Sequence, residues 1–146
     1  MNISHYMKDE HRLCDDYFAK AEEAAAKKDW EEATKKFEIF AHETLQHFKK
    51  EEEVLFPAFE KHTGSTEGPT AVMKYEHEQV KGLIGKMASA ILDEDVDAYL
   101  SLAESMMILL QQHNMKEEQM LYAMCDNILP VTIKEETLET MKHTEL

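Results

Sequence analysis

Apolar side chains recur every three or four residues over four long stretches of the chain. This is the period of an amphipathic α-helix, and little of the sequence alternates as a half-buried strand would. The pattern predicts helices over about residues 2–27, 30–61 and 69–92, and a fourth from the acidic turn at 93–95 to Pro130. Because short connections join long helices, we expect an all-α fold, an up-down-up-down four-helix bundle.

The breaks between these stretches carry turn residues. Residues 28–29 separate the first two helices, and residues 63–69 form the clearest loop because they contain glycine and proline. Pro57 lies inside the second pattern and is expected to kink that helix or loosen its preceding turn. The predicted domain is a bundle over residues 1–129, followed by a tail over 130–146 that could form a short helix. No internal repeat is apparent.

Four of the eight histidines occupy core positions of the predicted helices, and two of them precede a glutamate on the same face by one turn. Burying an imidazole or a carboxylate is costly unless the group is paired or bound to metal. A single core histidine usually just hydrogen-bonds to a neighbour, but six such groups from four helices favour a metal site. The candidate ligands are His11, His47, Glu51, His77, His113 and Glu117.

The four histidines are also expected at one depth in the bundle. His11 and His47 are equally far in sequence from the first turn at Asp29, on either side of it. His77 and His113 flank the third turn at almost equal distances. At a rise of about 1.5 Å per residue, each pair is level to within about 3 Å. The spacing therefore predicts that these side chains meet in one layer.

Histidine and carboxylate ligands without thiolate suit iron, manganese or zinc, whereas magnesium and calcium prefer oxygen ligands alone. Glu51 and Glu117 could each bridge two ions held by the histidines. The Glu-x-x-His pattern of ferritin-like di-iron bundles is missing, because no glutamate lies three residues before any of the four histidines. The zincin pattern is missing too, since His42 and His47 are five residues apart. Tyr122 lies near the core positions and is expected to pack there.

The composition narrows the possible partners. The formal net charge is −14, and Arg12 is the only arginine among 16 basic residues. Nucleic acids and anionic membranes both attract basic surfaces, so neither is an expected partner. No apolar run is long enough to span a bilayer, and no signal-peptide pattern is seen, so a cytoplasmic location is expected. Cys14 and Cys125 should lie far apart in the bundle and remain free thiols.

Four segments together give the chain a family resemblance. Residues 9–12 read DEHR, residues 47–57 read HFKKEEEVLFP, residues 73–78 read MKYEHE and residues 113–118 read HNMKEE. Over roughly residues 3–129 the chain resembles a hemerythrin-like domain of the His-His-Glu cation-binding type. The resemblance implies a four-helix bundle with two iron ions joined by an oxo or hydroxo bridge. It implies terminal ligation by His11, His47, His77 and His113, and bridging by Glu51 and Glu117.

The chain departs from the oxygen-carrying hemerythrins at two points. Those proteins have His-x-x-x-His on the third helix, where this chain has Met73 at the first position. They have His-x-x-x-x-Asp on the fourth helix, where this chain offers Glu117 and then Glu118. The resemblance therefore favours the stress-response and iron-sensing branches of the family over reversible oxygen carriage. Glu118 or His42 could supply the missing ligand.

These features lead to two alternative functions. The first is a di-iron protein that binds or reacts with oxygen, nitric oxide or peroxide in oxidative or nitrosative stress. The second is a non-catalytic module that senses oxygen or iron. Under both alternatives the expected ligand is a small diatomic molecule or peroxide. Turnover of that ligand would distinguish the two, so the sequence leaves open whether the protein is an enzyme. A plain bundle whose histidines only titrate is the third alternative, which metal content would exclude.

Overall fold

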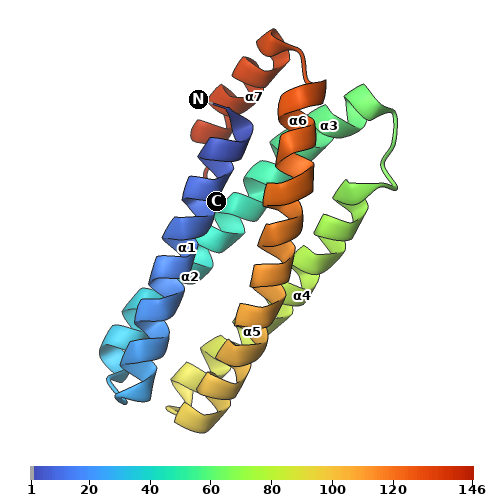
Figure 1. Ribbon diagram of the computed structural model, residues 1–146. Helices are drawn as coiled ribbons and strands as arrows, with labels where there is room; N and C mark the ends of the chain where they lie inside the picture. Colours follow the sequence, from blue (N-terminus) through green and yellow to red (C-terminus); the bar gives the residue numbers. More distant parts are fainter. Residues whose placement is uncertain (1) are drawn as a thin grey trace.

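The computed structural model describes residues 2–146 and is helical over most of this length (Figure 1). No strand is present among these residues, so the predicted all-α class is confirmed. The helical elements in chain order are α1 (Ile3–Ala26), α2 (Trp30–Lys50), η1 (Glu51–Leu55), α3 (Phe56–Thr63), α4 (Pro69–Leu92), α5 (Val96–Lys116), η2 (Glu117–Leu121), α6 (Tyr122–Ile128) and α7 (Val131–Lys142).

Four long helices lie side by side and form the body of the molecule (Figure 1). Helix α1 packs against α2 and α5, and α4 packs against α5 and α2, so each long helix touches two others. The turns between α1 and α2 and between α4 and α5 lie at one end, whereas α3, α6 and α7 lie towards the other (Figure 1). No helix within residues 2–146 is long and apolar enough to cross a membrane.

Polar caps fix where the long helices begin. Asn2, Asp29 and Asp95 each accept a hydrogen bond from a backbone N–H of the first helical turn that follows. Such caps satisfy donors that lack an intrahelical partner. Just before the two aspartates, Lys28 and Glu94 adopt positive φ angles of 58° and 51°. The two tight turns are therefore built in the same way.

Two apolar clusters form the core, and the six candidate ligands lie between them along the helices. The cluster nearer the α1–α2 turn includes Phe18, Phe40 and Tyr99. The opposite cluster includes Leu55 and Tyr122, and α7 adds side chains to it. The histidine layer is thus closed by apolar packing at both ends, which keeps bulk water away from it.

The second and fourth helices contain wide π-turns that the helical period did not predict. One π-turn spans Glu51–Leu55 and the other Glu117–Leu121, so both begin at a candidate bridging glutamate. In each turn a backbone N–H bonds to the carbonyl five residues earlier, and such turns are frequent at functional sites. Pro57 lies just after the first, in the first turn of α3, which agrees with the predicted loosening of the preceding turn.

The π-turns correct the predicted core positions that follow them. If the period of 3.6 residues continued past Glu117, it would place Met120 on the core face, but the Met120 side chain is 58% exposed. Leu121 and Tyr122 are buried instead. The extra residue in the turn rotates the rest of the helix, so the residue five positions after Glu117 faces the centre. Figure 1 shows the helix continuing as α6 beyond this turn.

The chain contains an internal repeat, so the expectation that it has none was wrong. A constant offset of 66 residues relates α1–α3 to α4–α6. The offset pairs the π-turns, the positive-φ turn residues and the aspartate caps with one another. It also pairs residues 11 and 77, 47 and 113, and 51 and 117. Identities outside the site and the turns are few, which is why the sequence concealed the repeat.

Candidate metal centre

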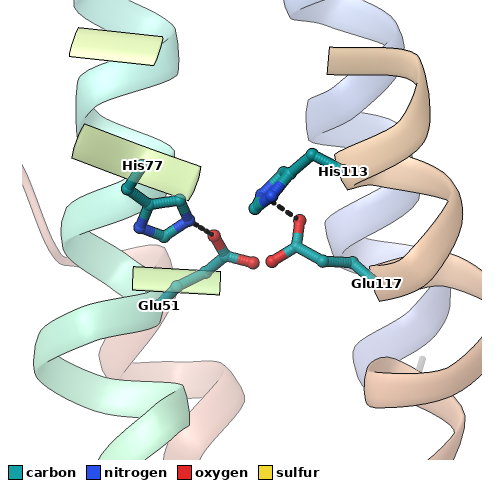
Figure 2. Close-up of side chains that lie close together, drawn as sticks. All are labelled: Glu51, His77, His113 and Glu117. Carbon is teal, nitrogen blue, oxygen red and sulfur yellow. Dashed lines mark ion pairs between the residues drawn. The ribbon is translucent and has the colours of Figure 1, made fainter. Parts of the chain in front are cut away.

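The six predicted ligands converge and are buried. His11 and His47 are 4% and 3% exposed, and the other four side chains are completely inaccessible. The convergence that the sequence predicted is therefore confirmed. Figure 2 shows Glu51 and Glu117 facing each other across the centre, each next to a histidine. The side chains come from α1, α2, α4, α5 and the two π-turns.

The ligand atoms form two overlapping groups, each with all its atoms within 4.8 Å of one another. One group contains His11, His47 and Glu117, and the other contains His77, His113 and both glutamates. We call the pair His11 and His47 the first half-site, and the pair His77 and His113 the second half-site. The repeat relates one half-site to the other.

Each glutamate lies between the two half-sites. Glu117 Oε1 is 3.2 Å from Nε2 of His11 and 3.2 Å from Nε2 of His113. Glu51 Oε1 is 3.0 Å from Nε2 of His77, and its Oε2 is 3.5 Å from Nε2 of His47. Both carboxylates therefore reach a histidine of either half-site. Glu51 does so through two oxygens, and Glu117 through one.

Several buried atoms at the centre have no hydrogen-bond partner among residues 2–146. They are one carboxylate oxygen of each glutamate and the Nε2 atoms of His77 and His113. His77 Nε2 and Glu51 Oε1 form a close ion pair, yet their orientation is not that of a hydrogen bond. Buried polar atoms rarely remain unpaired, and each such case needs a reason. A cation at the centre supplies it, and the nitrogen and oxygen donors fit a metal ion.

A comparison with protein-family models matches residues 2–125 to the hemerythrin HHE cation-binding domain. The chain belongs to this family. No curated protein and no solved structure is significantly similar to the chain. Hemerythrin HHE domains bind metal cations. Membership of this family therefore explains why a small all-helical domain buries six polar side chains in one layer.

Each of the four candidate ligand histidines of this hemerythrin domain has a glutamate on its outer nitrogen. The Nδ1–H groups donate to carboxylates at 2.7 Å for His11, 2.8 Å for His47, 2.6 Å for His77 and 2.8 Å for His113. These contacts fix the rings with Nε2 towards the centre, as the outer partners of metal-bound histidines do. The four accepting residues are, in the same order, Glu118, Glu10, Glu52 and Glu76.

The sequence analysis did not identify these outer glutamates as partners of the histidines, although their positions in the sequence indicate this role. Glu10 and Glu76 directly precede a candidate ligand, and Glu52 and Glu118 directly follow one. A neighbour along a helix is rotated by about 100°, so it faces the adjacent helix rather than the centre. Glu118, considered above as a ligand, therefore orients His11, and His42 is exposed and belongs to neither ligand group.

Two lysines hold two of the outer glutamates in place. Lys50 pairs with Glu10 and Lys116 pairs with Glu76, again 66 residues apart. Lys50 is only 5% exposed and also donates to the hydroxyl of Tyr6 at 2.8 Å. Burial alone would raise the pKa of Glu10, but His47 and Lys50 lower it to about 2. Lys50 therefore points inward as Glu51 does, although both belong to a run of charged residues.

The surrounding carboxylates produce a negative potential at the histidines. Burial lowers the pKa of each of the four, but the nearby glutamates outweigh this effect and raise it overall. For His47 the pKa rises well above the usual value. A field that favours a proton on these imidazoles also favours a metal cation in its place, and the ion then displaces the proton.

Tyr122 lies inside the centre, which the expectation of simple packing missed. Its hydroxyl donates to Glu51 Oε2 at 2.7 Å or to Glu117 Oε1 at 3.0 Å. Burial raises the pKa of Tyr122 well above its usual value, and the two carboxylates add to this. The π-turn brings this residue inward, since Tyr122 N–H bonds to Glu117 O.

The first half-site has the Tyr122 hydroxyl beside its histidines, whereas apolar side chains surround the second half-site. The ring of Phe48 stacks on His77 with a centroid separation of 3.8 Å and an interplanar angle of 12°. Phe56 lies 5.9 Å from the same imidazole. Met73 is buried among apolar side chains one turn before His77, beside a small apolar pocket that Leu121 also lines. The two half-sites thus differ in polarity although their ligands match.

The cysteines take no part in the centre. Cys14 and Cys125 are both buried and unbonded, as predicted. They belong to opposite apolar clusters. Burial raises the pKa of both thiols, to about 12 for Cys125, so neither is an activated nucleophile.

The outer glutamates give a prediction that separates orientation from ligation. We expect Glu52→Gln or Glu76→Gln to weaken metal affinity by about 10- to 100-fold, because the histidine loses its charged partner but keeps its Nε2. Competition with a chelator of known affinity measures this change. The matched control is Glu53→Gln, an exposed position in the same π-turn, which should leave the affinity unchanged. Equal affinity in all three variants would contradict the assigned role.

Proposed function

We propose that this hemerythrin-domain protein is an up-down-up-down four-helix bundle that holds two iron ions and binds or reacts with a small oxidant. The first half-site and the second half-site would each hold one ion through their histidines. Glu51 and Glu117 would bridge the two. The observation that carries the proposal is that each of these carboxylates reaches a histidine of both half-sites.

The donor set favours iron over the other candidate metals. Magnesium and calcium prefer oxygen ligands alone, and the centre offers four imidazoles. Structural zinc is almost always tetrahedral and completes its coordination with four ligands. Bridging carboxylates, imidazoles and free coordination positions are typical of non-haem iron. The absence of a nearby thiolate agrees with this choice, because both cysteines lie outside the two ligand groups.

The bound metal would supply redox chemistry and a position for a diatomic or peroxide ligand. The protein's own residues orient the ligand histidines and shield the centre from water. The outer glutamates keep Nδ1 of each histidine protonated and aim Nε2 inward. The two apolar clusters exclude water from both ends of the layer. Met73, in place of a histidine, would leave the second half-site with one ligand fewer, and this favours reaction or sensing over oxygen carriage.

Metal analysis tests the proposal directly. Protein purified without chelator is expected to contain two iron ions per chain, or to take up two ferrous ions under anaerobic conditions. A variant that lacks His11 and His77 removes one terminal ligand from each half-site and should bind less iron. Stoichiometric zinc that iron cannot displace, or no metal at all, would overturn the proposal.

Met73 gives a prediction about reactivity. Replacing Met73 with histidine adds a nitrogen donor one turn before His77, and we expect slower consumption of peroxide or nitric oxide by the iron-loaded protein. Stopped-flow measurement of oxidant loss tests this. The control is Met107→His, at an exposed position of α5 outside both ligand groups, which should leave the rate unchanged. If Met73→His leaves both the spectrum and the rate unchanged, this position does not face the second half-site.

A sensing role is the second candidate, and one contact favours it. Helix α7 packs directly against the π-turn that begins at Glu51. Beyond α7, Lys49 donates to the carbonyl of Glu145 at 2.6 Å. A change in metal occupancy at Glu51 would thus act on a segment next to the tail. Metal-dependent protection of α7 from hydrogen exchange, without oxidant turnover, would favour sensing over reaction.

A further inference from the structure

The hydroxyl of Tyr122 occupies a position that simple packing does not explain. It lies 3.2 Å from Nε2 of His11 and 3.2 Å from Nε2 of His47. It also lies 2.7 Å from Glu51 Oε2 and 3.0 Å from Glu117 Oε1. Four atoms of the proposed ligands therefore surround one phenolic oxygen, and all of them are buried.

The phenolic oxygen has hydrogen-bond partners, but hydrogen bonds no longer satisfy the whole cluster once both histidines are neutral. A phenol has one proton and can donate it to one acceptor at a time. Histidines that bind metal are neutral, and His11 and His47 then carry their proton on Nδ1, because Glu118 and Glu10 only accept. The Nε2 lone pairs then face the lone pairs of the phenolic oxygen. A cation among these atoms would turn mutual repulsion into ligation.

The separations fit shared coordination of one ion. Metal bonds to imidazole nitrogen and carboxylate oxygen are about 2.1 Å long, so ligands at right angles lie about 3 Å apart. The phenolic oxygen is within a few tenths of an ångström of this value from all four of its neighbours, in His11, His47, Glu51 and Glu117. Tyr122 thus stands where an additional ligand of the first half-site would stand.

The repeat shows that the second half-site has no such oxygen. The offset of 66 residues pairs Tyr122 with Phe56, and the two follow equivalent π-turns. Phe56 is fully buried beside His77 and carries no donor atom. The hydroxyl therefore distinguishes two half-sites whose other ligands are the same.

We propose that Tyr122 is a seventh protein ligand of the centre and binds, through its phenolic oxygen, the ion held by His11 and His47. This inference rests on the proposed di-iron function and deepens it. When the ion binds, the phenolic O–H bond breaks, the oxygen–iron bond forms and the proton leaves to solvent, as from other ionisable metal ligands. No oxidant or reductant is consumed in this step.

Ligation by Tyr122 makes the two ions unequal. An anionic oxygen donor favours the harder ferric state, so the first half-site would hold the iron that is more difficult to reduce. The second half-site, next to Phe48, Phe56 and Met73, would keep the free position for a small oxidant. The class of ligand expected there is a neutral diatomic molecule or peroxide, because its surroundings are apolar.

Visible absorption and resonance Raman spectroscopy of the ferric, iron-loaded protein test the inference. Phenolate bound to ferric iron gives a charge-transfer band in the visible and enhanced ring vibrations on excitation into it. We expect both in the unmodified protein, with the vibrations shifted by ring-deuterated tyrosine. Tyr122→Phe should lose the band and the vibrations. The matched control is Tyr99→Phe, a fully buried tyrosine in the other apolar cluster, which should keep both.

The outcomes separate this inference from the function on which it rests. Iron-loaded, unmodified protein without phenolate vibrations, or a band that persists in Tyr122→Phe, would overturn ligation by Tyr122 and leave the di-iron proposal standing. Failure of the unmodified protein to bind iron would overturn both. The isotope experiment needs no substitution, so the test holds even if Tyr122→Phe does not fold.

Discussion

Glu51→Ala and Glu117→Ala are each expected to give a folded helical protein that retains at most one tightly bound iron ion. Each carboxylate lies between the two half-sites, so its loss removes a ligand from both ions. Loss of a single terminal histidine should affect one ion more than the other. Iron per chain after gel filtration, with circular dichroism to establish folding, measures the effect.

The chain offers a matched control for this experiment. Glu53 belongs to the same π-turn as Glu51 but is exposed, so Glu53→Ala should keep two irons. A general effect of removing acidic charge would lower the iron content of all three variants alike. Two irons in both Glu51→Ala and Glu117→Ala would show that neither carboxylate is a bridge.

Removal of the metal is expected to lower the melting temperature by about 10 °C while the helices persist. A ligand present at 100 to 1,000 times its dissociation constant stabilises the folded state by about 3–4 kcal/mol. For a domain of about 150 residues, each kcal/mol corresponds to about 2–4 °C. The buried glutamates and histidines also lose the cation that binds them together, which adds to the cost.

Thermal unfolding with and without a strong chelator measures this stabilisation. The double variant Glu51→Ala and Glu117→Ala serves as the control, because it should show no chelator-dependent shift. An equal shift in the control would mean that the chelator acts elsewhere on the protein. An unmodified protein whose melting temperature is unaffected by complete metal removal would contradict the account.

The ligand layer could be predicted from the sequence because its signal is periodic. His11, His47, His77 and His113 each replace an apolar residue on a helical core face, and the turns set their depth. Those two facts do not depend on how the helices pack in detail. The helices, their short turns and the convergence of the histidines therefore followed from spacing alone.

The surroundings of that layer could not be predicted in the same way. The π-turns change the helical register after Glu51 and Glu117, so a fixed period assigned Met120 to the core and overlooked the approach of Tyr122. The outer glutamates depend on which helices are neighbours, because Glu10 acts on His47 across a helix interface. Local patterns do not report such contacts.

The repeat could have supplied part of this information. Its offset of 66 residues aligns an acid–histidine pair at residues 10–11 with another at 76–77. It also aligns two segments that each begin with histidine and end with two glutamates, at residues 47–52 and 113–118. Because all four outer glutamates fall within these segments, their repetition marks them as part of the site.

The most direct test of the central claim is anomalous X-ray diffraction at the iron edge from crystals of the iron-loaded protein. We predict two anomalous peaks, one beside His11 and His47 and the other beside His77 and His113, with Glu51 and Glu117 contacting both. A single peak, or two peaks without a shared glutamate, would contradict the account of a carboxylate-bridged di-iron centre.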